Sequence, residues 1–220
     1  MKKRITDLHP RTFLAFAASL VTTLLNAQYN DKGTVHLAVG PSFGIHSTRY
    51  EQRIVISGAE FPETTNDGAA TITYPIQVGY GFSRLFSLGL LIEPGSYLDS
   101  NATRSNSLII YGVEPRFHVV NKDRFAWMVG GQFGGSSLTI QEQGQNVSEA
   151  KYSGSLFGLD TGVAFLFTEH FGLQIHLRYL ATRMPLKDFS LSGSSIVLSN
   201  FEAELNTSGV ALQTSLAFRF

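Results

Sequence analysis

The sequence predicts an all-β fold, an eight-stranded antiparallel up-and-down transmembrane β-barrel. Eight segments alternate between large apolar residues and small or polar ones, which is the period-two pattern of β-strands. The connections between these segments alternate between short and long. The last alternating segment ends on an aromatic residue, Phe220. Together these observations indicate strands that cross a membrane and return.

Composition excludes several classes of protein. The chain has 220 residues, no net charge and no cysteine, and only 15% of its residues are charged, below the ~25% usual in soluble domains. The absence of cysteine excludes disulfides, thiolate metal sites and a lipidated N-terminal cysteine. Zero net charge provides no field that would attract nucleic acid, so we expect no nucleic-acid partner.

The N-terminus has the pattern of a secretory signal peptide. A basic start at 2–4 precedes the apolar stretch Phe13–Leu25, and Leu25-Asn26-Ala27 resembles a cleavage site. The alternative is a retained membrane helix, but this stretch of 13 residues falls short of the ~20 that a span requires. We therefore expect 1–27 to be a cleaved signal peptide and 28–220 to be the barrel domain, with the cut uncertain by a residue or two.

Each of the eight segments divides its residues between two faces. In the last segment Val210, Leu212 and Phe220 lie on one face, while Gln213 and Arg219 lie on the other. The segments are 34–46, 70–82, 86–98, 106–119, 125–139, 157–167, 171–179 and 209–220. A soluble sandwich or lipocalin-like barrel also alternates, but it packs its large side chains inside. Here the side chains of the second face have too little volume to form a core with the large apolar side chains exposed to water. We therefore expect large residues toward lipid and small polar residues in a narrow lumen.

The connections give the barrel an orientation. Short turns are expected at 83–85, 121–124 and 168–170, and longer polar loops at 47–69, 99–105, 140–151 and 183–206. In outer-membrane barrels the short turns face the periplasm, so both chain ends are predicted to be periplasmic. Aromatic residues on the outward face recur eight positions apart in four segments, as two interfacial girdles would require. These pairs are Tyr74 and Phe82, Phe125 and Phe133, Phe157 and Phe165, and Phe171 and Tyr179.

Four prolines fall inside the predicted strands: Pro41, Pro75, Pro94 and Pro115. Because a closed barrel has no free edge for proline, we expect each at a bulge or where a strand leaves the membrane. The strand registers beyond them would then shift by one residue.

The signal segment, the eight strands and the ending Leu216-x-Phe218-x-Phe220 resemble the small outer-membrane β-barrels, the OmpA-like and OmpX-like proteins. The style of the strands is similar to porin-like barrels of the Bacteroidetes type. The resemblance implies residence in a Gram-negative outer membrane, among lipid and lipopolysaccharide. It also implies that Phe218 and Phe220 act as a signal to the barrel-assembly machinery.

Charged residues on the inward face are candidate functional residues. Glu93, Glu114 and Asp160 are expected near mid-height, opposite Arg116 and Arg178. Buried charges must be paired, so one interpretation is a salt-bridge plug that fills the lumen. The other is a gate, in which rearranged pairs open a narrow ion path.

Motifs for catalysis are weak. Asp160-Thr161-Gly162 matches one aspartic-protease triplet, but that chemistry needs a second carboxylate. His46-Ser47 is the only adjacent pair suited to lipid hydrolysis, and no acid is placed beside it. The inward His36, His118 and His176 lack metal-ligand spacing. We therefore predict no enzymatic activity, no cofactor and no metal.

Function is predicted to lie in the loops. Loops 47–69 and 183–206 mix charged and apolar residues, so they either extend the strands as hairpins or dock a partner. The leading hypothesis is a non-enzymatic structural, adhesion or docking role involving a surface protein partner. The alternatives are a small gated pore or a transport or secretion accessory subunit, followed by an outer-membrane lipid-modifying enzyme.

Overall fold

The computed structural model describes residues 28–56, 59–100, 105–142, 148–191, 194–195 and 201–220. The predicted signal peptide, 1–27, lies outside them. The strands are β1 (Val35–Val39), β2 (Ser42–Ile56), β3 (Ala59–Thr73), β4 (Ile76–Gly81), β5 (Phe86–Asp99), β6 (Asn106–Asn121), β7 (Phe125–Glu142), β8 (Ser148–Leu166), β9 (Phe171–Leu191), β10 (Ser194–Ser195) and β11 (Phe201–Arg219). Strands β1 and β2 are two parts of one barrel strand, and so are β3 and β4.

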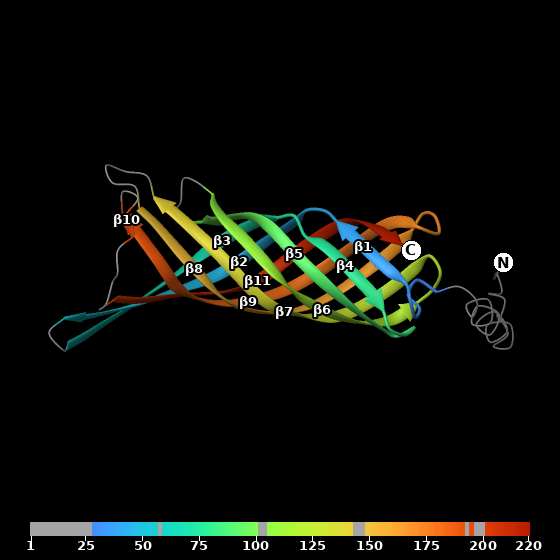
Figure 1. Cartoon of the computed structure of the whole chain (residues 1–220), viewed down its shortest axis with the longest axis horizontal. Helices are drawn as coiled ribbons and strands as arrows, with labels where there is room; N and C mark the ends of the chain where they lie inside the picture. The colour runs from blue at the N-terminus through green and yellow to red at the C-terminus, as the bar shows by residue number, and fades with distance from the viewer. Residues whose placement is uncertain (1–27, 57–58, 101–104, 143–147, 192–193, 196–200) are drawn as a thin grey trace, which may run out of the picture.

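The strands close into a ring, as Figure 1 shows. Each barrel strand pairs antiparallel with its neighbours in the sequence, and the ring closes where β11 pairs with β1 and β2. The two-residue β10 pairs only with the end of β9. The eight-stranded antiparallel barrel predicted from the sequence is confirmed.

The two ends of the barrel differ in length and form. At the turn end, on the right of Figure 1, short turns join β4 to β5, β6 to β7 and β8 to β9. Phe220 reaches the same end and exchanges two backbone hydrogen bonds of 2.9 Å with Val35. At the opposite loop end, most of the predicted loops are strands. Loop 47–69 is almost entirely the β2–β3 hairpin, so the predicted extension of the strands is confirmed for this loop.

The outward face of the barrel is a continuous apolar band. Large side chains there stay well exposed, such as Leu90 at 63%, Phe117 at 56% and Leu212 at 52%. Exposing many such side chains to water would cost roughly 1.5–3 kcal/mol each, so this surface fits a lipid environment. Among the residues described, no helix is long and apolar enough to cross a membrane.

Aromatic rings encircle the turn end of this band. The ring centroids of Phe86 and Phe117 are 5.3 Å apart, and those of Phe125 and Phe165 are 5.0 Å apart. Phe171 and Phe218 continue the belt at 5.3 Å. Such a girdle marks the level where the apolar band meets the headgroups.

The inward face is polar only in part. In the middle and toward the turn end it carries polar and small side chains, as expected. Toward the loop end the interior is a hydrophobic core that includes Leu108, Leu138, Tyr152, Met184 and Leu205. The expectation of a uniformly small and polar lumen is therefore wrong. The strands run on past the apolar outer band, and their side chains pack on one another as in a water-soluble barrel.

The prolines interrupt the hydrogen-bond ladder without moving it. Pro41 separates β1 from β2 and Pro75 separates β3 from β4, yet the partner pairs keep one register on both sides. Pro94 and Pro115 lie within regularly paired β5 and β6. The two register shifts occur elsewhere, between His118 and Val120 and between Lys151 and Tyr152. The predicted slips at the prolines are wrong, because pairing to the strand on the other side holds each segment in place.

Candidate functional site

A buried ion pair lies at the centre of the lumen. The Arg178 Nη2 donates to Glu93 Oε2 at 2.7 Å and to Gln132 Oε1 at 2.7 Å. Both charged residues are almost fully buried, at 2% and 1% exposed. Thr73 donates a further hydrogen bond to Glu93. Strands β9, β5 and β7 thus meet across the lumen through one guanidinium group.

A second charged group lies closer to the turn end. Arg116 Nη2 contacts Glu114 Oε2 at 3.1 Å, and its Nε lies 3.9 Å from Asp160 Oδ2. Asp160 Oδ2 is also 3.0 Å from His176 Nδ1. Glycine at 162 makes this approach possible, because a Cβ there would overlap the His176 ring.

Two glutamines join these groups into one network. Gln213 accepts from Arg178 and donates to Gln77, which donates to Glu114 at 3.2 Å. All five charged residues singled out in the sequence, Glu93, Glu114, Arg116, Asp160 and Arg178, therefore lie in the lumen and belong to one connected set of contacts.

The network leaves little open space. One cavity on its turn-end side and one on its loop-end side each hold about 20 Å³, which is room for about one water molecule. The hydrophobic core lies beyond the second cavity. In this conformation the lumen is filled by side chains, the arrangement that the plug interpretation describes.

The residues considered for catalysis do not form a catalytic arrangement. His46 faces the lumen, where its Nε2 hydrogen-bonds Thr71 Oγ1 at 3.0 Å, whereas the next residue, Ser47, lies on the exposed outer face. In the described part of the chain, no three His, Asp or Glu residues gather as metal ligands. The inward His36 and His118 contact Asn30 and Ser87 instead.

The barrel wall divides at the loop end. Pairing between β9 and β11 stops at Pro185 and Glu204, but β11 continues along β2 as far as Phe201 and Ile54. On the other side, β3 pairs with β5 only from Ala69 onward. We call the three-stranded extension formed by 47–56, 59–68 and 201–206 the arm; its hairpin extends at the far left of Figure 1.

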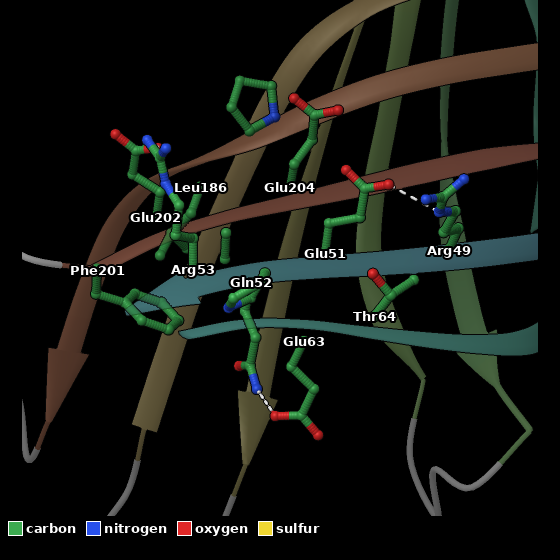
Figure 2. Close-up of a pocket in the computed structure, with 13 residues that line it drawn as sticks. Arg49, Glu51, Gln52, Arg53, Glu63, Thr64, Leu186, Phe201, Glu202 and Glu204 are labelled. Carbon is green, nitrogen blue, oxygen red and sulfur yellow. Dashed lines mark hydrogen bonds and ion pairs between the residues drawn. The ribbon is translucent and has the colours of Figure 1, made fainter. Parts of the chain in front are cut away.

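A groove lies where the arm separates from β9. Its volume is about 530 Å³, and Figure 2 shows its side chains arising from β2, β3, β9 and β11. Leu186 and Phe201 provide its apolar part. The lining residues are Arg49, Glu51, Gln52, Arg53, Pro62, Glu63, Thr64, Pro185, Leu186, Phe201, Glu202, Ala203 and Glu204.

The groove is acidic. Arg49 pairs with Glu51 at 2.7 Å, and Arg53 pairs with Glu202. The hydrogen bond to Glu202 raises the pKa of Arg53 above its ordinary value, so this arginine stays charged. The lining contains two arginines and four glutamates, a formal charge of +2 − 4 = −2. Over the whole arm, Arg49 and Arg53 stand against six carboxylates, Glu51, Glu60, Glu63, Asp67, Glu202 and Glu204, a formal charge of −4.

The sequence pattern does not predict this groove, because its residues come from two segments that were expected to form separate loops. The pattern also predicts no role for Gln28–Asp31 at the turn end, although Tyr29 in this segment is buried, at 1% exposed. The one clue to this segment in the sequence is that it directly follows the predicted cleavage site. The two aromatic residues suggested as an assembly signal lie at the same end: Phe218 contacts Phe171, and Phe220 is 68% exposed and stacks on His170.

No protein-family model and no curated protein sequence matches this chain. Solved structures do match. The outer membrane protein OprG from Pseudomonas aeruginosa aligns with a TM-score of 0.60 at 9% identity, covering 87% of this chain and 97% of OprG. Neisserial surface protein A (13% identity, 78% and 96% covered, TM-score 0.42) and Ail, the attachment invasion locus protein of Yersinia pestis (10%, 86% and 99%, 0.41), align less closely. The chain therefore shares its fold, an eight-stranded antiparallel barrel, with the outer membrane protein OprG.

Proposed function

We propose that this chain is a non-enzymatic outer-membrane barrel that docks a surface protein through its arm. The observation that carries the proposal is the arm itself, a sheet extension beyond the barrel wall with an acidic groove beside it, whose strand edges have no ladder partner among the residues that the structure describes. A filled lumen offers no comparable site. The separation of His46 from Ser47 argues against lipid hydrolysis.

The orientation is part of the proposal. Short turns and both Gln28 and Phe220 lie at one end of the barrel, which we assign to the periplasm. The arm then stands outside the cell, where a partner can reach it.

The exposed edge of β3 suggests how a partner binds. Ser100 N donates to Gly68 O at 3.0 Å, but within the described residues the backbone of Ala59–Asp67 pairs only with β2, so the other edge of that stretch is available to a further strand. An extended segment of another protein can add there as a further strand. Because the arm has a formal charge of −4, the partner segment is expected to be basic, and anionic lipopolysaccharide is a poor fit.

Titration with an extended peptide of alternating lysine and valine tests this function. We expect the purified barrel to bind the peptide, with affinity that falls as salt is added. The double variant Glu63→Gln/Glu204→Gln removes two groove carboxylates, and we expect roughly tenfold weaker binding. The matched control is Glu149→Gln/Asp188→Asn, which removes two partly exposed carboxylates that pair with Lys151 at the same end on β8 and β9.

Two results would contradict the proposal. One is equal weakening by both double variants, which would reduce the effect to net charge. The other is equal binding of a peptide in which every second valine is proline, because proline cannot donate to the β3 edge.

A further inference from the structure

The chain immediately after the predicted signal peptide turns back against the barrel. We call residues Gln28–Asp31 the strap. Its backbone contacts the β6–β7 turn, where Tyr29 N donates to Lys122 O at 2.8 Å. Asn30 is 0% exposed, and its Nδ2 donates to Ser83 O in the β4–β5 turn at 2.6 Å. The strap therefore joins two turns that are far apart in sequence.

Two barrel residues hold the strap in return. Asn121 Oδ1 accepts from Asn30 N at 2.8 Å, and its Nδ2 donates to Asn30 O at 2.7 Å. Arg219 Nη1 donates to Gln28 O at 2.9 Å, and the same guanidinium contacts Asp123. The strap is anchored by hydrogen bonds from both sides of the mouth.

Tyr29 fills the mouth. Its ring stacks on His36 at 4.9 Å and lies 5.9 Å from His118, and its hydroxyl accepts a hydrogen bond from Gln174. With the strap in place, the inward residues at this end are buried: His36 is 9% exposed and both His118 and Gln174 are 2% exposed. The cavity above Tyr29 reaches Glu114 and Arg116.

The strap is not part of the barrel sheet and is joined to it by a glycine turn. Gly33 has φ of +91°, the only positive-φ glycine among the described residues, and no atom would contact a Cβ placed there. Lys32 and Gly33 are both exposed. A side chain at position 33 would strain this turn, because φ of +91° is unfavourable for every residue except glycine, whereas the exposed side chain of Lys32 can be changed without that strain.

We propose that the strap is a plug that closes the turn end of the barrel, and that its release opens the lower lumen to water as far as the Glu114–Arg116 pair. The plug is independent of the arm. The hydrophobic core separates the charged network from water at the loop end, and the strap does so at the turn end.

Cysteine labelling tests the plug directly, because the chain has no native cysteine. The reporters are Ala38→Cys and Ser87→Cys, which line the cavity above Tyr29 and are 2% and 5% exposed. Each is labelled in detergent micelles with a small anionic methanethiosulfonate. With the native strap we expect slow labelling, and with Tyr29→Ala/Asn30→Ala we expect at least tenfold faster labelling at both reporters.

Asn121→Ala provides a second way to release the strap, because it removes the two hydrogen bonds to the Asn30 backbone without changing the strap itself. A third reporter, Thr207→Cys, lines the cavity beyond the ion pairs and should be unaffected by either change. The exposed Lys32→Ala is the matched control within the same segment. Heat-modifiable gel mobility shows which variants fold. Equal labelling rates with and without the strap, whether fast or slow, in the folded variants would overturn the proposal.

Discussion

Arg178 shows how much of this barrel depends on single side chains. Its guanidinium joins Glu93, Gln132 and Gln213, which come from three other strands. Removing one partner of a buried ion pair leaves the other charge uncompensated, and that costs more than the pair itself contributes.

We expect Arg178→Ala to lower the free energy of unfolding by about 3–5 kcal/mol, measured by urea titration of the barrel in lipid vesicles. Arg183→Ala is the control. Its side chain is 72% exposed and pairs with Glu204 at 2.9 Å, so we expect a loss below about 1 kcal/mol. Equal losses for the two variants would mean that the central pair is solvated.

Among the elements, the strap and the arm are the two that depart from the regular barrel. Both lie where strands have lost a pairing partner or have not yet begun to pair. The strap is held by a few hydrogen bonds, and the arm is held by the ladders among its own three strands. Small changes should therefore move them while the wall stays intact.

Gly33→Ala should loosen the strap. A non-glycine residue at φ of +91° costs about 1–2 kcal/mol, which corresponds to a roughly five- to thirtyfold change in an equilibrium. We expect faster labelling of Ala38→Cys by a factor in that range. The control is Gly68→Ala, since an added Cβ there would come no closer than 3.9 Å to another atom and the φ is not positive; a comparable increase in that variant would exclude backbone strain as the cause.

For the whole molecule, the exposed apolar surface separates the part in the membrane from the part in water. Leu90 lies in the outward band at 63% exposed, and Phe61 lies on the arm at 55% exposed. Exposure alone does not distinguish them. Their different heights along the barrel predict different environments.

Leu90→Arg should destabilise the folded barrel in vesicles by about 2–4 kcal/mol, because it places a charge against lipid near the midplane. Phe61→Arg should change stability by less than about 0.5 kcal/mol, as for an ordinary surface position. Urea unfolding measures both. A large cost for Phe61→Arg would place the arm within the membrane and remove the basis for docking.

The eight barrel strands, and which residues of each strand face outward, could be predicted from the local sequence alone. Period-two alternation is a local property of the sequence. It therefore predicts that Phe117 and Leu212 face outward and that Glu114 and Gln213 face the lumen, as they do. The alternation of short and long connections is also local. The same alternation predicts that the five charged residues of the network face the lumen: Glu93, Glu114, Arg116, Asp160 and Arg178.

Features that depend on contacts between neighbouring strands could not be predicted in this way and became visible in the folded barrel. Pro75 and Pro94 keep their registers because strands on either side hold them, and no single-strand pattern contains that restraint. The strap reaches Asn121 and Arg219 from a distant part of the chain, and the groove forms because β9 and β11 separate above Pro185 and Glu204. These features arise from how strands pair around a closed ring, and the ring exists only once the barrel has folded.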